Sequence, residues 1–128
     1  MSELETVQKD RITHTQLVRY AGASGDFNPI HTVVPIGEKA GLGGVIAHGM
    51  LVMGMAGEAL TTWFPRQHVR NFKVRFSAMT RPGEKLTIVG TIEEEKMVNE
   101  EERLTGKIFV KNEDGEVKLK GRFEVIKP

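Results

Sequence analysis

The spacing of hydrophobic residues changes once along the chain, near residue 65, and the change separates a helical part from a strand-rich part. From Val45 to Phe64 nearly every side of a helix would be apolar. A helix without a wide polar face must be surrounded by protein. We therefore expect a buried helix that begins at Val45 and ends before Pro65.

After Pro65 the chain alternates between apolar and polar positions, which is the period of half-buried strands. Phe72, Val74 and Phe76 are predicted to face one way, while the residues between them face the other. Three further strands are expected at 86–92, 104–110 and 117–125, with turns at 81–84 and 112–115. The charged run 93–103 is expected to form strand ends and a solvated hairpin.

The residues before Val45 are turn-rich. Thr13 is predicted to cap a helix that runs to Ala21, and a weak edge strand is expected at 5–12. A second short helix is expected at 35–40, followed by the glycine-rich link 41–44.

Between these two short helices lies the loop from Gly25 to His31. Asp26, Asn28 and Pro29 favour a defined turn in this loop. Phe27 and Ile30 are expected to anchor it in the core, so that Asp26 and His31 point the other way.

These elements predict an α+β domain over residues 1–128, in which an antiparallel sheet of four or five strands curls around one buried helix. This arrangement is called a hot-dog fold. Such a sheet leaves hydrogen-bonding edges open, and the far side of the helix needs a cover. Pairing of two subunits would solve both problems, so we expect a dimer.

Composition narrows the function classes. The 128 residues include 39% hydrophobic and 27% charged positions, with a net charge of +1, which gives no strong case for binding nucleic acid. The chain has no cysteine, which excludes disulfides and thiolate chemistry. The first residues lack a secretory pattern, and the apolar run contains His48 and Glu58, so we expect a soluble cytoplasmic protein without a membrane span.

Two groups of residues could carry chemistry. Asp26 and His31 offer a carboxylate and an imidazole that can transfer protons near neutral pH. The alternative is that Asp26 only caps a turn or helix and that His31 is an ordinary loop histidine. The second group is His48-Gly49. If the helix itself starts at this pair, the Gly49 N–H lies in its first turn, has no helical partner and can donate to a carbonyl oxygen. The alternative is a core histidine beside a glycine selected for close packing.

The residues of these groups resemble a known motif. Tyr20–His31, with Ser-Gly-Asp-Phe-Asn-Pro-Ile-His at its end, together with Gly41-Leu42, Ile46–Met50 and Arg81–Leu86, is similar to the hydratase 2 motif of the MaoC-like dehydratases. The resemblance covers nearly the whole chain. It implies a dimeric hot-dog domain that adds water reversibly, in the syn sense, to a trans-2-enoyl thioester of CoA or a carrier protein, giving an R-3-hydroxyacyl thioester.

The resemblance also implies roles for individual residues. Asp26 and His31 become the catalytic pair and Gly49 supplies the oxyanion N–H; the residues implied in substrate binding are Ser24, Asn28, His48 and Met50. No metal or cofactor is implied. Many members carry Asp-Pro just after the catalytic His, where this chain has Val33-Val34. That pair caps the next short helix, so the local geometry of this helix is expected to differ.

Other interpretations remain open from sequence alone. Some hot-dog thioesterases place their carboxylate on the central helix, so Glu58, or Asp26, could serve a thioesterase. The chain could also be one subunit of a heterodimeric dehydratase. Outward-facing cations on the strands are mostly expected to be solvated, although they could meet nucleotide or pantetheine phosphates; they are Lys73, Arg75, Lys118, Lys120 and Arg122.

Overall fold

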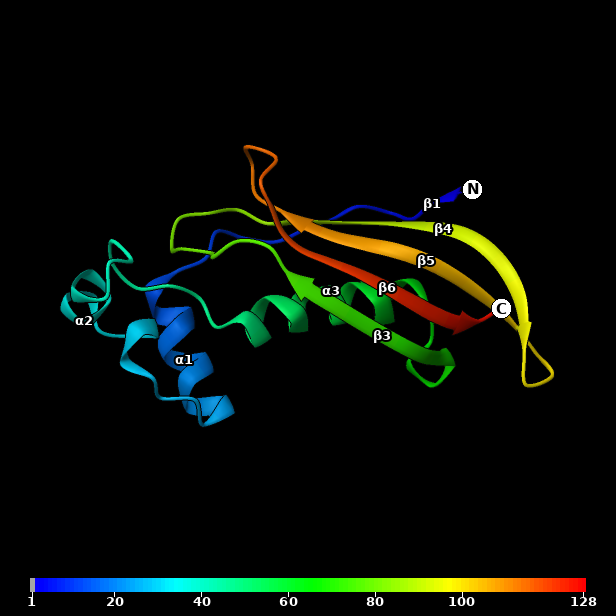
Figure 1. Ribbon diagram of the computed structural model, residues 1–128, viewed down its shortest axis with the longest axis horizontal. Helices are drawn as coiled ribbons and strands as arrows, with labels where there is room; N and C mark the ends of the chain where they lie inside the picture. The colour runs from blue at the N-terminus through cyan, green and yellow to red at the C-terminus, as the bar shows by residue number, and fades with distance from the viewer. Residues whose placement is uncertain (1) are drawn as a thin grey trace.

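A six-stranded antiparallel sheet curves along the molecule, and a fifteen-residue helix runs against its inner face (Figure 1). The computed structural model describes residues 2–128. The strand order is β1-β4-β5-β6-β3, and β2 also pairs with β4. The strands are β1 (Ser2–Glu3), β2 (Val7–Gln8), β3 (Val69–Phe76), β4 (Thr87–Val98), β5 (Glu101–Lys111) and β6 (Val117–Ile126). The predicted α+β class is confirmed, and the weak strand expected at 5–12 is reduced to β2.

The helices are α1 (His14–Ser24), α2 (Val34–Lys39) and α3 (Gly49–Trp63), with 3₁₀ turns η1 (Pro29–His31) and η2 (Arg66–His68). Thr13 caps α1 as predicted, because its hydroxyl accepts a hydrogen bond from the Gln16 N–H at 3.0 Å. Gly25 ends α1 in the left-handed region at φ 78°. In Figure 1, α1 and α2 lie together at the end of the sheet away from the β4–β5 hairpin.

The buried helix α3 begins at Gly49, so the predicted start at Val45 is wrong. Two tertiary hydrogen bonds explain the delay. The Ile46 carbonyl accepts from His31 Nδ1 at 2.8 Å, and the Ala47 N–H donates to the Thr80 carbonyl at 2.7 Å. Backbone groups held in this way are not available for helical pairing, so residues 45–48 form an extended approach to the helix.

The core lies between α3 and the inner face of the sheet. Its fully buried members include Leu17, Ala56, Leu60, Leu86, Ile88, Ile108, Leu119 and Phe123. The alternation after Pro65 therefore predicts the inward positions of the strands well. The turns follow the sequence too, since Gly83 adopts φ 93° and Asn99 and Glu100 adopt φ 50° and 66° between β4 and β5.

One expected anchor is absent from this core. Phe27 is 69% exposed, so the prediction that it pins the loop inward is wrong, and the half-buried Ile30 and the buried His31 hold the loop instead. Within residues 2–128, no helix has the length and apolarity needed to cross a bilayer.

Gly106 shows how tightly the sheet packs. A Cβ at this position of β5 would lie 2.2 Å from the Thr91 carbonyl oxygen and 2.4 Å from the Phe123 ring. Gly54 on α3 is exposed, and a Cβ there would meet nothing within 4 Å.

We therefore expect Gly106→Ala to lower the free energy of unfolding by about 1–3 kcal/mol, because backbone and ring must move apart. Gly54→Ala, the matched control, should raise it by about 0.5–1 kcal/mol through helix propensity. Urea unfolding followed by circular dichroism measures both. Equal effects of the two substitutions would show that the close packing at Gly106 does not limit stability.

Candidate functional site

The loop between α1 and η1 is shaped by three successive side-chain-to-backbone hydrogen bonds. Ser24 Oγ accepts from the Asp26 N–H at 3.1 Å, and Asp26 Oδ1 accepts from the Asn28 N–H at 3.2 Å. Asn28 Oδ1 then accepts from the Ile30 N–H at 3.2 Å and caps η1. Each bond spans two residues, as in Asx and ST turns. Residues 24, 26 and 28 are thereby turned toward the backbone of the loop, which leaves Phe27 on its outer side.

His31 is buried at the end of this loop, and one of its ring nitrogens is already bound. Nδ1 lies 2.8 Å from the Ile46 carbonyl oxygen, which can only accept, so Nδ1 carries a proton. The neutral ring then has its lone pair on Nε2. Nε2 lies 4.0 Å from Asp26 Oδ2. The two groups predicted to act together therefore face each other, and the imidazole is held in the tautomer that can take a proton there.

His48 lies behind this pair. Its ring stacks on His31 with centroids 3.8 Å apart and an angle of 22° between planes, and the edge of Tyr20 contacts its other side. His48 Nε2 donates to the Asp26 backbone oxygen at 3.1 Å. With 2% of its surface exposed, His48 supports the His31 ring and the backbone of Asp26 from within the protein.

The first turn of α3 offers two free donors beside His31. Among residues 2–128, neither the Gly49 N–H nor the Met50 N–H has a hydrogen-bond acceptor. The N-terminus of a helix also carries roughly half a positive charge. These donors can therefore stabilise a negative charge that develops on a ligand oxygen.

His31 and Gly49 line the same pocket, whose volume is about 430 Å³. Apolar atoms from Val52, Phe76 and Met79 form much of its wall, so the pocket can take an apolar group of a ligand. Of the other residues predicted at the site, Ser24 and Asn28 bond the loop backbone, and the Met50 side chain is 58% exposed. Their roles in binding stay predictions.

The same cluster of acidic and histidine side chains could also bind a metal ion. Ligand atoms of Asp26, His31 and His48 lie within 4.8 Å of one another. A histidine ligates through a lone pair in the plane of its ring, and the two rings are stacked nearly parallel. Lone pairs in parallel planes do not converge on one ion, so the donor geometry favours proton transfer over metal binding.

Sequence reasoning missed Lys118, which lines the same pocket. It is 1% exposed, so the expectation of a solvated outward lysine is wrong. Its Nζ donates to the Met79 carbonyl at 2.8 Å and pairs with Glu84 at 2.7 Å and with Glu116. The residues between β3 and β4 cover a position that strand alternation alone places outside. The alternation carries no sign of that cover.

The Lys118 cluster changes the ionisation of its members. Burial alone would raise the pKa of Glu84, but hydrogen bonds from Lys118, Asn112 and the Arg81 N–H outweigh burial and lower it. Burial would likewise lower the pKa of Lys118, and its two carboxylate partners raise it instead. Both groups therefore stay charged over the neutral range.

The structure also shows where Glu58 and the Val33-Val34 pair lie. Glu58 is exposed and pairs with Lys9 at 2.5 Å. It lies nine residues after Gly49 on α3, which is about 13 Å along the helix axis, too far to act on the Asp26–His31 pair. At the Val33-Val34 departure, Val33 is the N-cap of α2 and makes no side-chain hydrogen bond there, and a difference in the geometry of this helix stays a prediction.

Comparisons with known proteins identify the family and the fold. A sequence model described as "MaoC like domain" matches residues 2–113. A probable dehydratase of Ajellomyces capsulatus is 33% identical over 69 residues, which cover 52% of this chain and 18% of that protein. A fatty acid synthase beta subunit of Emericella nidulans is 40% identical over 72 residues, which cover 54% of this chain and 4% of that protein. The chain thus spans less than a fifth of the length of these relatives.

Among solved structures, the unliganded R-hydratase PhaJ1 of Pseudomonas aeruginosa has a TM-score of 0.82 and 24% identity, over 97% of this chain and 80% of that chain. The two chains share their fold, and the predicted hot-dog arrangement is confirmed.

The lowered pKa of Glu84 predicts a pH dependence of stability. Its pKa is lower in the folded than in the unfolded protein. The ionised group therefore contributes its full stability above the unfolded value, and this is lost as the pH falls through the folded value. We expect Glu84→Gln to be less stable than the parent at about pH 7, with the difference shrinking toward about pH 3.

Urea unfolding at several pH values measures this difference. Glu38→Gln serves as the control, because Glu38 is exposed and has no ion-pair partner among residues 2–128. A difference between parent and Glu84→Gln that stays constant with pH would contradict the ionic role of Glu84.

Proposed function

The chain belongs to the MaoC-like dehydratase family, and from this premise we propose that it catalyses the reversible hydration of a trans-2-enoyl thioester to an R-3-hydroxyacyl thioester. The R configuration is inferred from the likeness of the Ser24–His31 motif to R-specific hydratases. The single observation that carries the proposal is that His31, whose Nε2 lies 4.0 Å from Asp26 Oδ2, lines the same pocket as Gly49, whose N–H has no acceptor among residues 2–128.

The facing pair suits the activation of one water. Two acceptors 4.0 Å apart can both receive hydrogen bonds from a water that lies about 2.8 Å from each. As the water oxygen forms a bond to C3 of the enoyl group, one of its protons passes to the pair, and the C2–C3 π electrons move toward the thioester. The same pair then returns a proton to C2. Addition of both groups from one face of the double bond gives the syn outcome.

The helix terminus suits the charge that this step creates. Electrons displaced from the double bond accumulate on the thioester oxygen as an enolate. The free N–H groups of Gly49 and Met50 can donate to that oxygen, and the α3 dipole adds to their effect. The step consumes no redox equivalent and forms no bond between substrate and protein.

We also propose that the chain acts as a dimer. β3 forms the open edge of the sheet, so its outer backbone groups lack partners within residues 2–128. A second copy or a related subunit that pairs along this edge would satisfy them. Because the chain spans only part of its curated relatives, a heterodimer or a place within a longer protein fits the same edge.

The first test addresses the pair itself. Asp26→Asn and His31→Ala should each lower kcat for hydration of crotonyl-CoA by at least about a hundredfold, because each removes a proton-transfer group. Loss of enoyl absorbance measures the reaction, and a thiol reagent monitors hydrolysis. Glu58→Gln is the control and should keep parental turnover.

Near-parental turnover in either Asp26→Asn or His31→Ala would sink the assignment of the pair. Release of free CoA by the parent without hydration would instead identify a thioesterase. Circular dichroism of each variant separates lost chemistry from lost folding.

The second test separates the Gly49 N–H from the space that glycine leaves. Gly49 is the first residue of α3, where proline is tolerated, and His48 has φ −62° and ψ 134°, which suits a residue before proline. Gly49→Pro removes the donor, whereas Gly49→Ala keeps it and adds a Cβ 3.3 Å from the half-exposed Phe76 ring.

We expect Gly49→Pro to lower kcat about a hundredfold below Gly49→Ala. Equal activity of the two variants would show that the N–H of Gly49 is not the oxyanion donor.

A further inference from the structure

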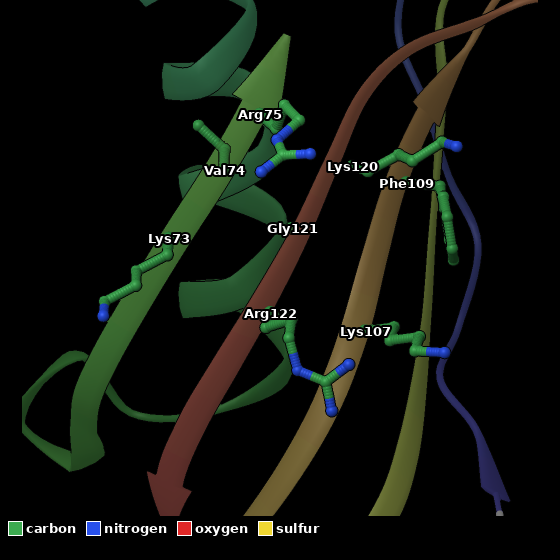
Figure 2. A pocket seen from close by; sticks show the side chains of 8 residues that line it. All are labelled: Lys73, Val74, Arg75, Lys107, Phe109, Lys120, Gly121 and Arg122. Atoms are coloured by element: carbon green, nitrogen blue, oxygen red, sulfur yellow. The ribbon is translucent and has the colours of Figure 1, made fainter. Parts of the chain in front are cut away.

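The outer face of the sheet carries a dense group of cations, which we call the basic surface: Lys73, Arg75, Lys107, Lys120 and Arg122. Figure 2 shows these side chains spread over β3, β5 and β6, with Arg122 between Lys73 and Lys107. They surround a hollow of about 610 Å³ that Phe109 also lines. The surface lies on the opposite side of the sheet from α3, because the residues that alternate with these cations on β6 are buried.

The cations of this surface are set directly against one another. In the register of the sheet, Lys73 faces Arg122, Arg75 faces Lys120, and Lys107 also faces Arg122. Like charges at directly opposed positions destabilise a sheet. A bound anion would relieve this repulsion. The arrangement therefore favours anion binding and does not contribute to the stability of the fold.

Few carboxylates neutralise the basic surface from within the chain. Glu93 pairs with Lys107 at 3.3 Å and with Arg122 at 2.8 Å. Within residues 2–128, the other three cations, Lys73, Arg75 and Lys120, have no ion-pair partner, and all three are exposed. The surface therefore keeps an excess of positive charge that is accessible to a ligand.

The basic surface also adjoins the pocket of the proposed reaction. Arg75 and Lys120 are register partners, and two residues further along their strands are Ser77 and Lys118, which line that pocket. Two residues of a strand span about 7 Å. A ligand whose anionic end lies on the basic surface is thus near enough for a flexible arm to enter the pocket.

We propose that the basic surface binds the phosphates of the CoA moiety of the thioester substrate, an inference that rests on the proposed function. In CoA, the adenosine carries a 3′-phosphate and a 5′-diphosphate. A flexible pantetheine arm links the diphosphate to the thioester. The three phosphate groups are equal in number to the three free cations and opposite to them in charge. The partly buried Phe109 ring in the hollow offers an apolar contact for the adenine. The volume of the hollow, about 610 Å³, lies in the range of small-molecule sites, which favours a small polyanion over the acidic face of a carrier protein.

The test compares two substrates that share the reacting group. Crotonyl-CoA carries the phosphates, whereas the crotonyl thioester of N-acetylcysteamine lacks them. The variant Arg75→Gln/Lys120→Gln should raise KM for crotonyl-CoA roughly tenfold, leave its kcat unchanged, and leave both constants unchanged for the truncated thioester. The control Arg66→Gln/Lys85→Gln removes one exposed Arg and one exposed Lys outside the surface and should change neither substrate's constants.

Three outcomes would overturn the proposal. An unchanged KM for crotonyl-CoA excludes the surface as its binding site, and an equal rise for both thioesters places the effect in the pocket. A raised KM for a crotonyl carrier protein alone would assign the surface to an acidic protein partner.

Direct binding keeps this test separate from the proposed function. If the parent hydrates neither thioester, the proposed function fails, and isothermal titration with free CoA still decides the binding question. We expect CoA to bind more weakly as salt rises and about tenfold more weakly to Arg75→Gln/Lys120→Gln, with pantetheine not affected by the substitutions. CoA binding of equal strength in parent and variant would overturn the inference.

Discussion

The hydrogen bond from His31 Nδ1 to the Ile46 carbonyl is the interaction on which the rest of the site depends. It links the loop after α1 to the approach to α3, although fifteen residues separate the two in sequence. It also sets the tautomer of the neutral ring, because a proton held on Nδ1 leaves the lone pair on Nε2, the atom that faces Asp26 and that we propose as the base. Finally, it removes the Ile46 carbonyl from helical pairing. The N–H of Met50, four residues later, is thereby left free, and α3 begins at Gly49. One buried contact thus fixes the tautomer of the proposed base and leaves a proposed oxyanion donor unpaired.

A second layer of contacts keeps that bond in place. His48 stacks on the His31 ring and holds the Asp26 backbone oxygen, so the two acid–base groups share a single buried support. On the other side of the pocket, Lys118 binds the Met79 carbonyl, and the adjacent Thr80 carbonyl accepts from the Ala47 N–H. The extended approach to α3 is therefore held from two directions. Reacting groups supported by buried contacts stay close to one geometry, which is what proton transfer requires.

Much of this molecule is predictable from local pattern. Alternation locates β3 to β6, the Thr13 cap locates the start of α1, and the Asp26–His31 pair follows from a motif. What the sequence did not predict depends on contacts between distant segments. The apolar run predicts that α3 starts at Val45, whereas the bond from His31 to the Ile46 carbonyl leads to a start at Gly49. The pattern of β6 predicts an exposed Lys118, because it contains no sign that another segment covers this residue. The loop pattern predicts that the apolar Phe27 points inward, but the direction of its side chain is set by the turn bonds around it.

The alternation of β6 explains how one strand can contribute to two environments. Leu119, Gly121 and Phe123 face α3 and are buried, and Lys120 and Arg122 between them face outward. The inner residues contribute packing that depends on register, since a shift by one position would turn every side chain to the wrong face. That packing offsets the repulsion among the outer cations, because burial of a single Leu or Phe side chain contributes about 1.5–3 kcal/mol, while an unfavourable exposed cross-strand pair costs less than about 1 kcal/mol. The inner face thus allows the outer face to carry a charge pattern that would not by itself favour a sheet. Selection for ligand binding can then act on the outer residues with little effect on the fold.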